Sequence, residues 1–127
     1  MSKTVIDFAD MQQMQKNLQE LHKGEWNPLT PLQARNQMLW LVDELGEAIA
    51  IIKKKGEKGI MEDENVRENF CAEMADVLMY LNDVLLCYDI SPEEISEAYT
   101  KKHEYNMKRN YVKQNEKLYT EYQKDLR

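Results

Sequence analysis

The chain has 127 residues, with 17 lysines and arginines against 23 aspartates and glutamates, which gives a net charge of −6. This length is typical of one domain with its own core, and the acidic balance argues against nucleic-acid polymers and membrane surfaces as partners, since both require a basic surface. No apolar run reaches the roughly 18 residues that span a membrane, and the first residues lack the apolar stretch of a signal peptide. We therefore expect a cytoplasmic protein with reduced cysteines.

Glycine and proline are scarce and divide the chain into segments with helical periodicity. No strand-like alternation or internal repeat is present. In chain order, we expect helices over about residues 5–22, 30–55, 65–88 and from 91 past 108, with a charged loop over 53–63. The sequence therefore predicts an all-α fold of the four-helix-bundle type. We expect one domain over 1–127, with its core at about 5–110 and a charged extension at 111–127.

The expected second and fourth helices begin with capping signals. Thr30 precedes a proline and has Gln33 three residues later, and Ser91 precedes a proline and has Glu94 three residues later. Both patterns combine a capping box with proline at the first helical position. Periodicity predicts core faces in the first three helices, made respectively of Phe8, Met11, Met14, Leu18 and Leu21, of Leu41, Leu45, Ala48 and Ile52, and of Phe70, Met74, Val77, Leu81, Val84 and Leu85.

The expected second and third helices each carry an acidic pair within apolar surroundings. Glu44 and Glu47 form the first pair, and Glu73 and Asp76 form the second. Residues at i and i+3 share one helix face, so antiparallel packing would bring four carboxylates together. Two such charges ~4 Å apart repel by about 4 kcal/mol at an effective dielectric near 20. Protonation relieves this repulsion, and so does a divalent cation, for which oxygen ligands favour Mg²⁺ or Mn²⁺.

Other interpretations of the acidic pairs stay open. Such pairs are common on solvated helix faces, and the chain would then be an interaction module that buries its apolar faces in an oligomer. A di-iron site would require Glu-x-x-His, but Gln19 and Thr100 stand three residues before His22 and His103. Asp83 continues the acidic stripe seven residues after Asp76; we expect it to be solvated, and the alternative is a residue that supports the acidic site from behind.

The segment Asp43-Glu44-Leu45-Gly46-Glu47, followed by Glu73-Met74-Ala75-Asp76, resembles the EExxE…ExxD signature of the MazG-type nucleoside triphosphate pyrophosphohydrolases. Ala34-Arg35-Asn36, the run from Ala75 to Leu81 and a preceding tryptophan, Trp26, are similar to the dCTP pyrophosphatase branch. The resemblance covers about residues 8–111. Lys102, Asn106 and Arg109 match the K-x-x-x-N-x-x-R/K pattern of that branch and of dimeric dUTPases.

The resemblance implies an all-α enzyme that uses Mg²⁺, with Mn²⁺ as the alternative, to hydrolyse an NTP or dNTP to the NMP and pyrophosphate. It further implies a homodimer or homotetramer. It does not imply the base, because Lys54 stands where dCTP enzymes carry tryptophan. The alternative function is a non-catalytic helical oligomer that binds nucleotide or metal. The expected catalytic and metal-binding residues are Glu44, Glu47, Glu73 and Asp76, and the expected substrate-binding residues are Trp26, Lys54, Lys102, Asn106 and Arg109.

Overall fold

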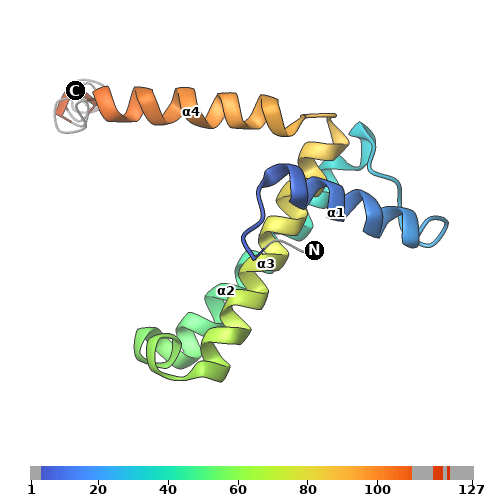
Figure 1. The fold of residues 1–127 in the computed structure, drawn as a ribbon. Coiled ribbons are helices and arrows are strands. Elements are labelled where there is room, and N and C mark those ends of the chain that lie inside the picture. Colours follow the sequence, from blue (N-terminus) through green and yellow to red (C-terminus); the bar gives the residue numbers. More distant parts are fainter. Residues whose placement is uncertain (1–3, 110–115, 119, 121–127) are drawn as a thin grey trace. The chain divides into compact units, whose positions relative to one another are not determined.

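The computed structural model describes residues 4–109, 116–118 and 120, and within them the regular elements are helices (Figure 1). This confirms the all-α prediction. The chain divides into two compact units, one ending at Pro92 and the other beginning at Glu93, so assembly of the helices into one bundle or one domain stays a prediction. The elements are α1 (Phe8–Leu21), a 3-10 turn η1 (Pro31–Gln33), α2 (Ala34–Glu62), α3 (Glu64–Cys87) and α4 (Pro92–Lys108).

Helix α1 begins where two aspartates cap each other. The Asp7 carboxylate accepts a hydrogen bond from the Asp10 amide at 2.8 Å, and the Asp10 carboxylate accepts one from the Asp7 amide at 3.0 Å. This reciprocal capping box satisfies amides that the first turn leaves free. It also explains why the helix begins at Phe8 rather than at the expected residue 5.

The expected core face of α1 is wrong in part. Met14 is 53% exposed and Leu21 is 76% exposed, whereas Gln12 and Gln15 are buried. Both glutamines have polar partners on the α3 side: Gln12 Nε2 donates to the Ile90 carbonyl at 3.1 Å, and Gln15 donates to Asp83. Buried polar groups require such partners, and these contacts turn a polar face of α1 toward α3.

The start and the end of α2 both differ from expectation. The Thr30 side chain makes no capping hydrogen bond, and a 3-10 turn precedes the helix. The expected loop over 53–63 is also wrong, because α2 continues to Glu62. Only Gly56 leaves helical geometry, with φ 65° and ψ −178°. Glycine adopts positive φ without a Cβ clash, so one residue forms the kink and the helix resumes.

A one-residue connection turns α2 into α3. Asp63 stands between them, and its carboxylate accepts from the amides of Asn65 at 2.9 Å and Val66 at 3.3 Å. This N-cap fixes the start of α3 at Glu64, close to the expected residue 65. Because the link is so short, α2 and α3 run antiparallel, packed side by side (Figure 1).

The apolar core of the first unit is small. Its fully buried apolar residues are Ala34, Ala48, Val84, Leu85 and Cys87. Three residues of the expected core faces are instead partly open to solvent: Leu45 is 38% exposed, Ile52 41% and Met74 39%. Periodicity found the apolar faces, but the chain by itself does not cover them. The other large apolar residues exposed on α2 are Met38, Leu39, Trp40, Val42, Ile49 and Met61.

Helix α4 belongs mainly to the second unit and ends at Lys108, whereas we expected it to continue past that residue. An ion pair between Lys101 Nζ and Glu97 Oε1 at 2.9 Å supports it at i, i+4 spacing, a surface contact of modest energy. Of the predicted extension, only 116–118 and 120 lie inside the described residues. No helix in the described part of the chain is long and apolar enough to cross a membrane.

Candidate functional site

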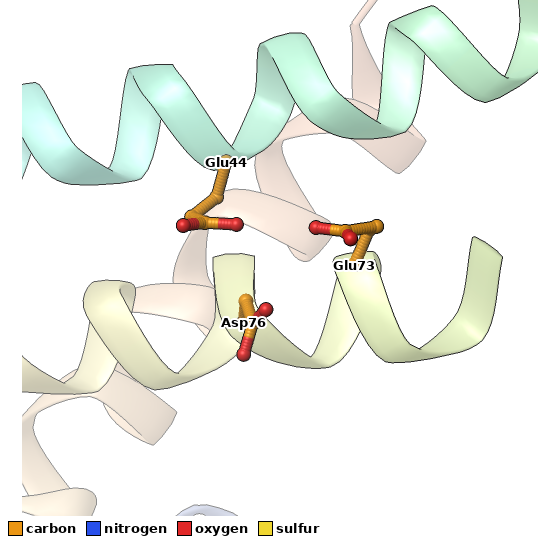
Figure 2. Close-up of side chains that lie close together, drawn as sticks. All are labelled: Glu44, Glu73 and Asp76. Atoms are coloured by element: carbon orange, nitrogen blue, oxygen red, sulfur yellow. The ribbon is translucent and has the colours of Figure 1, made fainter. Parts of the chain in front are cut away.

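Three of the four predicted acidic residues lie together between α2 and α3. Glu44 comes from α2, and Glu73 and Asp76 come from α3; one carboxylate oxygen of each lies within 4.8 Å of the others. Figure 2 shows the Glu44 side chain extending from α2 toward the two acids of α3. All three residues are half-buried. We call these three residues the acidic cluster; it forms because the tight link at Asp63 aligns the two helices.

The pKa of the Glu44 carboxyl is raised above its usual value. Burial is the main cause, followed by the charge of Asp76, a hydrogen bond with Glu73, and the charges of Glu73 and Glu47. Each of these effects disfavours the carboxylate relative to the neutral acid. The site therefore favours either a proton shared among the acids or a bound cation.

The donor set of the cluster fits a hard divalent cation. Its three groups are carboxylates, and no histidine or cysteine among the described residues joins them. Mg²⁺ and Mn²⁺ prefer oxygen ligands, and Mg²⁺ in proteins is typically held by one or two carboxylates together with water and substrate phosphates. Three carboxylates within 4.8 Å are thus chemically suited to the metal that the sequence predicts.

Glu47 is the predicted acid that the structure leaves outside the cluster. It is exposed and follows Glu44 by about one turn of α2. Its charge still contributes to the raised pKa of Glu44. The sequence predicted four converging carboxylates, and the structure brings three of them together.

A cleft of about 530 Å³ contains Asp76 of the cluster and extends along aromatic side chains. Its walls include Trp26, Trp40 and Tyr80, and we call it the aromatic cleft. Burial raises the pKa of the Tyr80 phenol, and the charges of Glu44, Asp83 and Asp76 add to the shift, which keeps the phenol neutral at the pH of most assays. The lining is mixed, because the polar residues Gln15, Gln37 and Asp83 line the cleft together with the aromatic rings.

Trp26 stands at the cleft because a turn after α1 holds it there. Its backbone amide donates to the His22 carbonyl at 3.0 Å, and its ring stacks on His22 with centroids 4.1 Å apart and planes 17° apart. The indole is 44% exposed. A half-open aromatic ring of this kind can stack on a planar ligand, as the sequence predicted for Trp26.

Asp83 is buried, and the expectation of a solvated residue is wrong. It is 5% exposed, and its Oδ1 accepts a hydrogen bond from Gln15 Nε2 at 2.9 Å. Burial raises the pKa of Asp83, and the hydrogen bond from Gln15 opposes the shift. Sequence reasoning missed this pair because Gln15 lies on a distant helix. The sequence did offer one signal for a role of Asp83 near the site: it lies on the same face of α3 as Asp76, seven residues further along.

The remaining predicted substrate residues are placed separately. Lys54 is exposed near the kink of α2. Lys102, Asn106 and Arg109 belong to the second unit. There, Lys102 Nζ lies 5.7 Å and Arg109 Cζ 5.8 Å from the Tyr105 ring centroid, so both cations border one aromatic face. Their role toward a triphosphate stays a prediction.

No protein-family model, curated protein or solved structure matches the chain. The MazG-type resemblance therefore stays a prediction from the motifs.

Proposed function

We propose that the protein is a Mg²⁺-dependent nucleotide pyrophosphohydrolase that converts an NTP or dNTP to the NMP and pyrophosphate. The observation that carries the proposal is the acidic cluster, whose carboxylate oxygens lie within 4.8 Å of one another beside the aromatic cleft. A polyanionic ligand with a planar ring matches this combination, because a cation can link its phosphates to the carboxylates while the ring lies against the aromatic walls.

Glu44, Glu73 and Asp76 would hold the metal, and Glu47, about one turn further along α2, is the fourth proposed ligand. Bound Mg²⁺ offsets the charge that develops on phosphate oxygens and lowers the pKa of coordinated water. Glu44 is also the proposed group that accepts a proton from the attacking water. Glu47 is the alternative base.

The aromatic cleft is the proposed position of the base. Trp26 and Trp40 offer rings for stacking, and Asp76 is shared by the cleft and the cluster. The triphosphate also requires cationic or donor groups. Arg109 suits this role because its guanidinium binds two oxygens at once, and the further proposed ligands are Lys54, Lys102 and Asn106.

A homodimer or homotetramer in the cytoplasm is part of the proposal. Support for assembly comes from the large apolar side chains that α2 leaves exposed, among them Leu39 at 60%, Val42 at 59% and Trp40 at 53%. Contiguous apolar surface of this kind is typical of interaction sites.

One observation favours a second candidate, a non-catalytic helical oligomer that binds nucleotide or metal. Glu47 lies outside the cluster, so three carboxylates converge rather than four. Three carboxylates can hold a cation for stability or sensing without positioning a water for attack.

A screen for pyrophosphate release separates the two. Canonical NTPs and dNTPs and several modified ones are incubated with Mg²⁺, Mn²⁺ or EDTA, and NMP is quantified beside pyrophosphate. We expect metal-dependent release that Asp76→Asn abolishes and that Glu68→Gln, an exposed acid on the same helix, leaves intact. Silence from a folded protein that binds Mg²⁺ in calorimetry would favour the binding module.

A further inference from the structure

We propose that Asp83 determines base specificity: its second carboxyl oxygen accepts a hydrogen bond from an N–H group at the edge of a nucleobase bound in the aromatic cleft. The inference rests on the proposed function for the identity of the ligand. It adds a residue that the acidic motif does not contain and that the sequence placed in solvent.

The first support is the incomplete hydrogen bonding of a buried acid. Asp83 is 5% exposed. Among the described residues, the bond from Gln15 Nε2 to Oδ1, at 2.9 Å, is the one that its carboxyl makes. Oδ2 is left for another donor. A carboxylate can accept about four hydrogen bonds. Oδ2 is not among the buried unpartnered atoms of the described residues, so it is open to solvent, and Asp83 lines the aromatic cleft.

The second support is where this oxygen is located. Asp83 lines the aromatic cleft together with Trp40 and Tyr80, and the same cleft contains Asp76. Asp83 follows Asp76 by seven residues on α3, which is about two turns and ~10 Å along the axis. That spacing is comparable with the length of a nucleoside monophosphate. A ligand with its phosphate at the acidic cluster would therefore place its base edge beside Asp83.

The third support is that docking of α1 does not require an acid at this position. Gln12 Nε2 already holds α1 to the chain after α3 by donating to the Ile90 carbonyl. Asparagine would accept from Gln15 equally well without the cost of a buried charge. Burial raises the pKa of Asp83 despite Gln15, and a further N–H donor would stabilise its carboxylate. Gln15 is the positioning residue because it holds the carboxyl through Oδ1.

Both tryptophans of the chain line the cleft, so intrinsic fluorescence reports its occupancy. CMP, UMP, AMP and GMP, which are products rather than substrates of the proposed reaction, are titrated in Mg²⁺ into the full-length protein and into Asp83→Asn. The variant keeps the shape of the side chain but can present an NH₂ donor in place of Oδ2. We expect the preferred base to bind about tenfold to a hundredfold more weakly and the order of preference to change. Equal weakening of all four, or no change, would overturn the proposal.

A matched control changes an acid of α3 that lies outside the cleft. Glu68 is an exposed acid on the same helix as Asp83 and does not line the cleft, so Glu68→Gln should leave the order of preference unchanged. If Asp83→Asn does not fold, the ligand is altered instead. The preferred monophosphate is compared with analogues methylated at each base nitrogen that carries hydrogen. One such methylation should weaken binding to the wild-type protein about tenfold or more, and uniform tolerance would contradict the proposed hydrogen bond.

Binding and turnover fail independently in this design. Base preference among the monophosphates that depends on Asp83, combined with no pyrophosphate release under any metal, would support this inference and refute the hydrolase. Pyrophosphate release with the same base ranking in wild type and Asp83→Asn would refute this inference and keep the hydrolase.

Discussion

Replacing Glu44 by glutamine removes one charge from the acidic cluster while nearly preserving its shape. Two unit charges 4.8 Å apart repel by about 3.5 kcal/mol at an effective dielectric near 20. Because the residues are half-buried, solvent screening lowers this to roughly 1 kcal/mol for each neighbour. With Glu73 and Asp76 as neighbours, Glu44→Gln should stabilise the metal-free protein by about 2 kcal/mol, or roughly 8 °C in Tm.

The same substitution should remove most of the response to metal. A ligand at a hundredfold excess over its Kd stabilises the folded state by about 2.7 kcal/mol, so wild-type Tm should rise by roughly 10 °C on adding Mg²⁺. Glu44→Gln replaces a charged ligand with a neutral amide and should show a much smaller rise. Thermal melts by circular dichroism in EDTA and in Mg²⁺ measure both effects.

Glu68→Gln is the control, since it removes an exposed charge from α3 outside the cluster. It should change Tm little in EDTA and keep the full response to Mg²⁺. The reasoning is refuted if Glu44→Gln is less stable than wild type in EDTA, or if it gains as much from Mg²⁺ as wild type does.

Further predictions address pH, catalysis, binding and the helix kink. The folded chain holds the Glu44 proton to higher pH than the unfolded chain, so metal-free wild type loses stability as pH rises between the two pKa values. The Tm advantage of Glu44→Gln should thus vanish below about pH 4 and grow above it, and a flat difference in melts across pH would contradict the shift. Asp76→Asn should abolish pyrophosphate release with unchanged helical content by circular dichroism; retained release would remove Asp76 from the site. Arg109→Ala should raise KM more than it lowers kcat if Arg109 binds the triphosphate equally in the ground and transition states. An unchanged KM in steady-state kinetics would show that Arg109 is an ordinary surface charge. Gly56→Ala places a Cβ at φ 65° and should cost about 1 kcal/mol in urea unfolding; unchanged stability would show that the kink does not depend on glycine.

The acidic cluster illustrates what spacing alone can predict. Helical periodicity set Glu73 and Asp76 on one face, and antiparallel packing was the stated condition for the acidic pairs to meet. The structure meets that condition and brings three of the four acids together. Glu47 differs because side-chain position on a helix surface depends on the local environment as well as on register. The sequence also indicated an interruption in this region, which we expected to be a loop over 53–63. The structure has a kink at Gly56 instead, because one residue with positive φ suffices.

Burial was the least predictable property. Apolar spacing placed Met14 and Leu45 in the core, yet both are exposed in the single chain. Periodicity identifies an apolar face but not what covers it. Asp83 failed in the opposite sense: it was expected in solvent, but it is buried and accepts a hydrogen bond from the buried Gln15. Such pairs depend on the packing of α1 on α3 and leave no local pattern.

The central claim is that the acidic cluster supports metal-dependent hydrolysis of a nucleoside triphosphate. The most direct test measures pyrophosphate and NMP released from the nucleotide panel by wild type and Asp76→Asn, each with Mg²⁺ or EDTA. If the protein is this hydrolase, wild type with Mg²⁺ releases equal amounts of pyrophosphate and NMP, and neither product forms with EDTA or with the variant. Absence of release from folded wild-type protein across the panel, or release that is insensitive to EDTA and to Asp76→Asn, would contradict it.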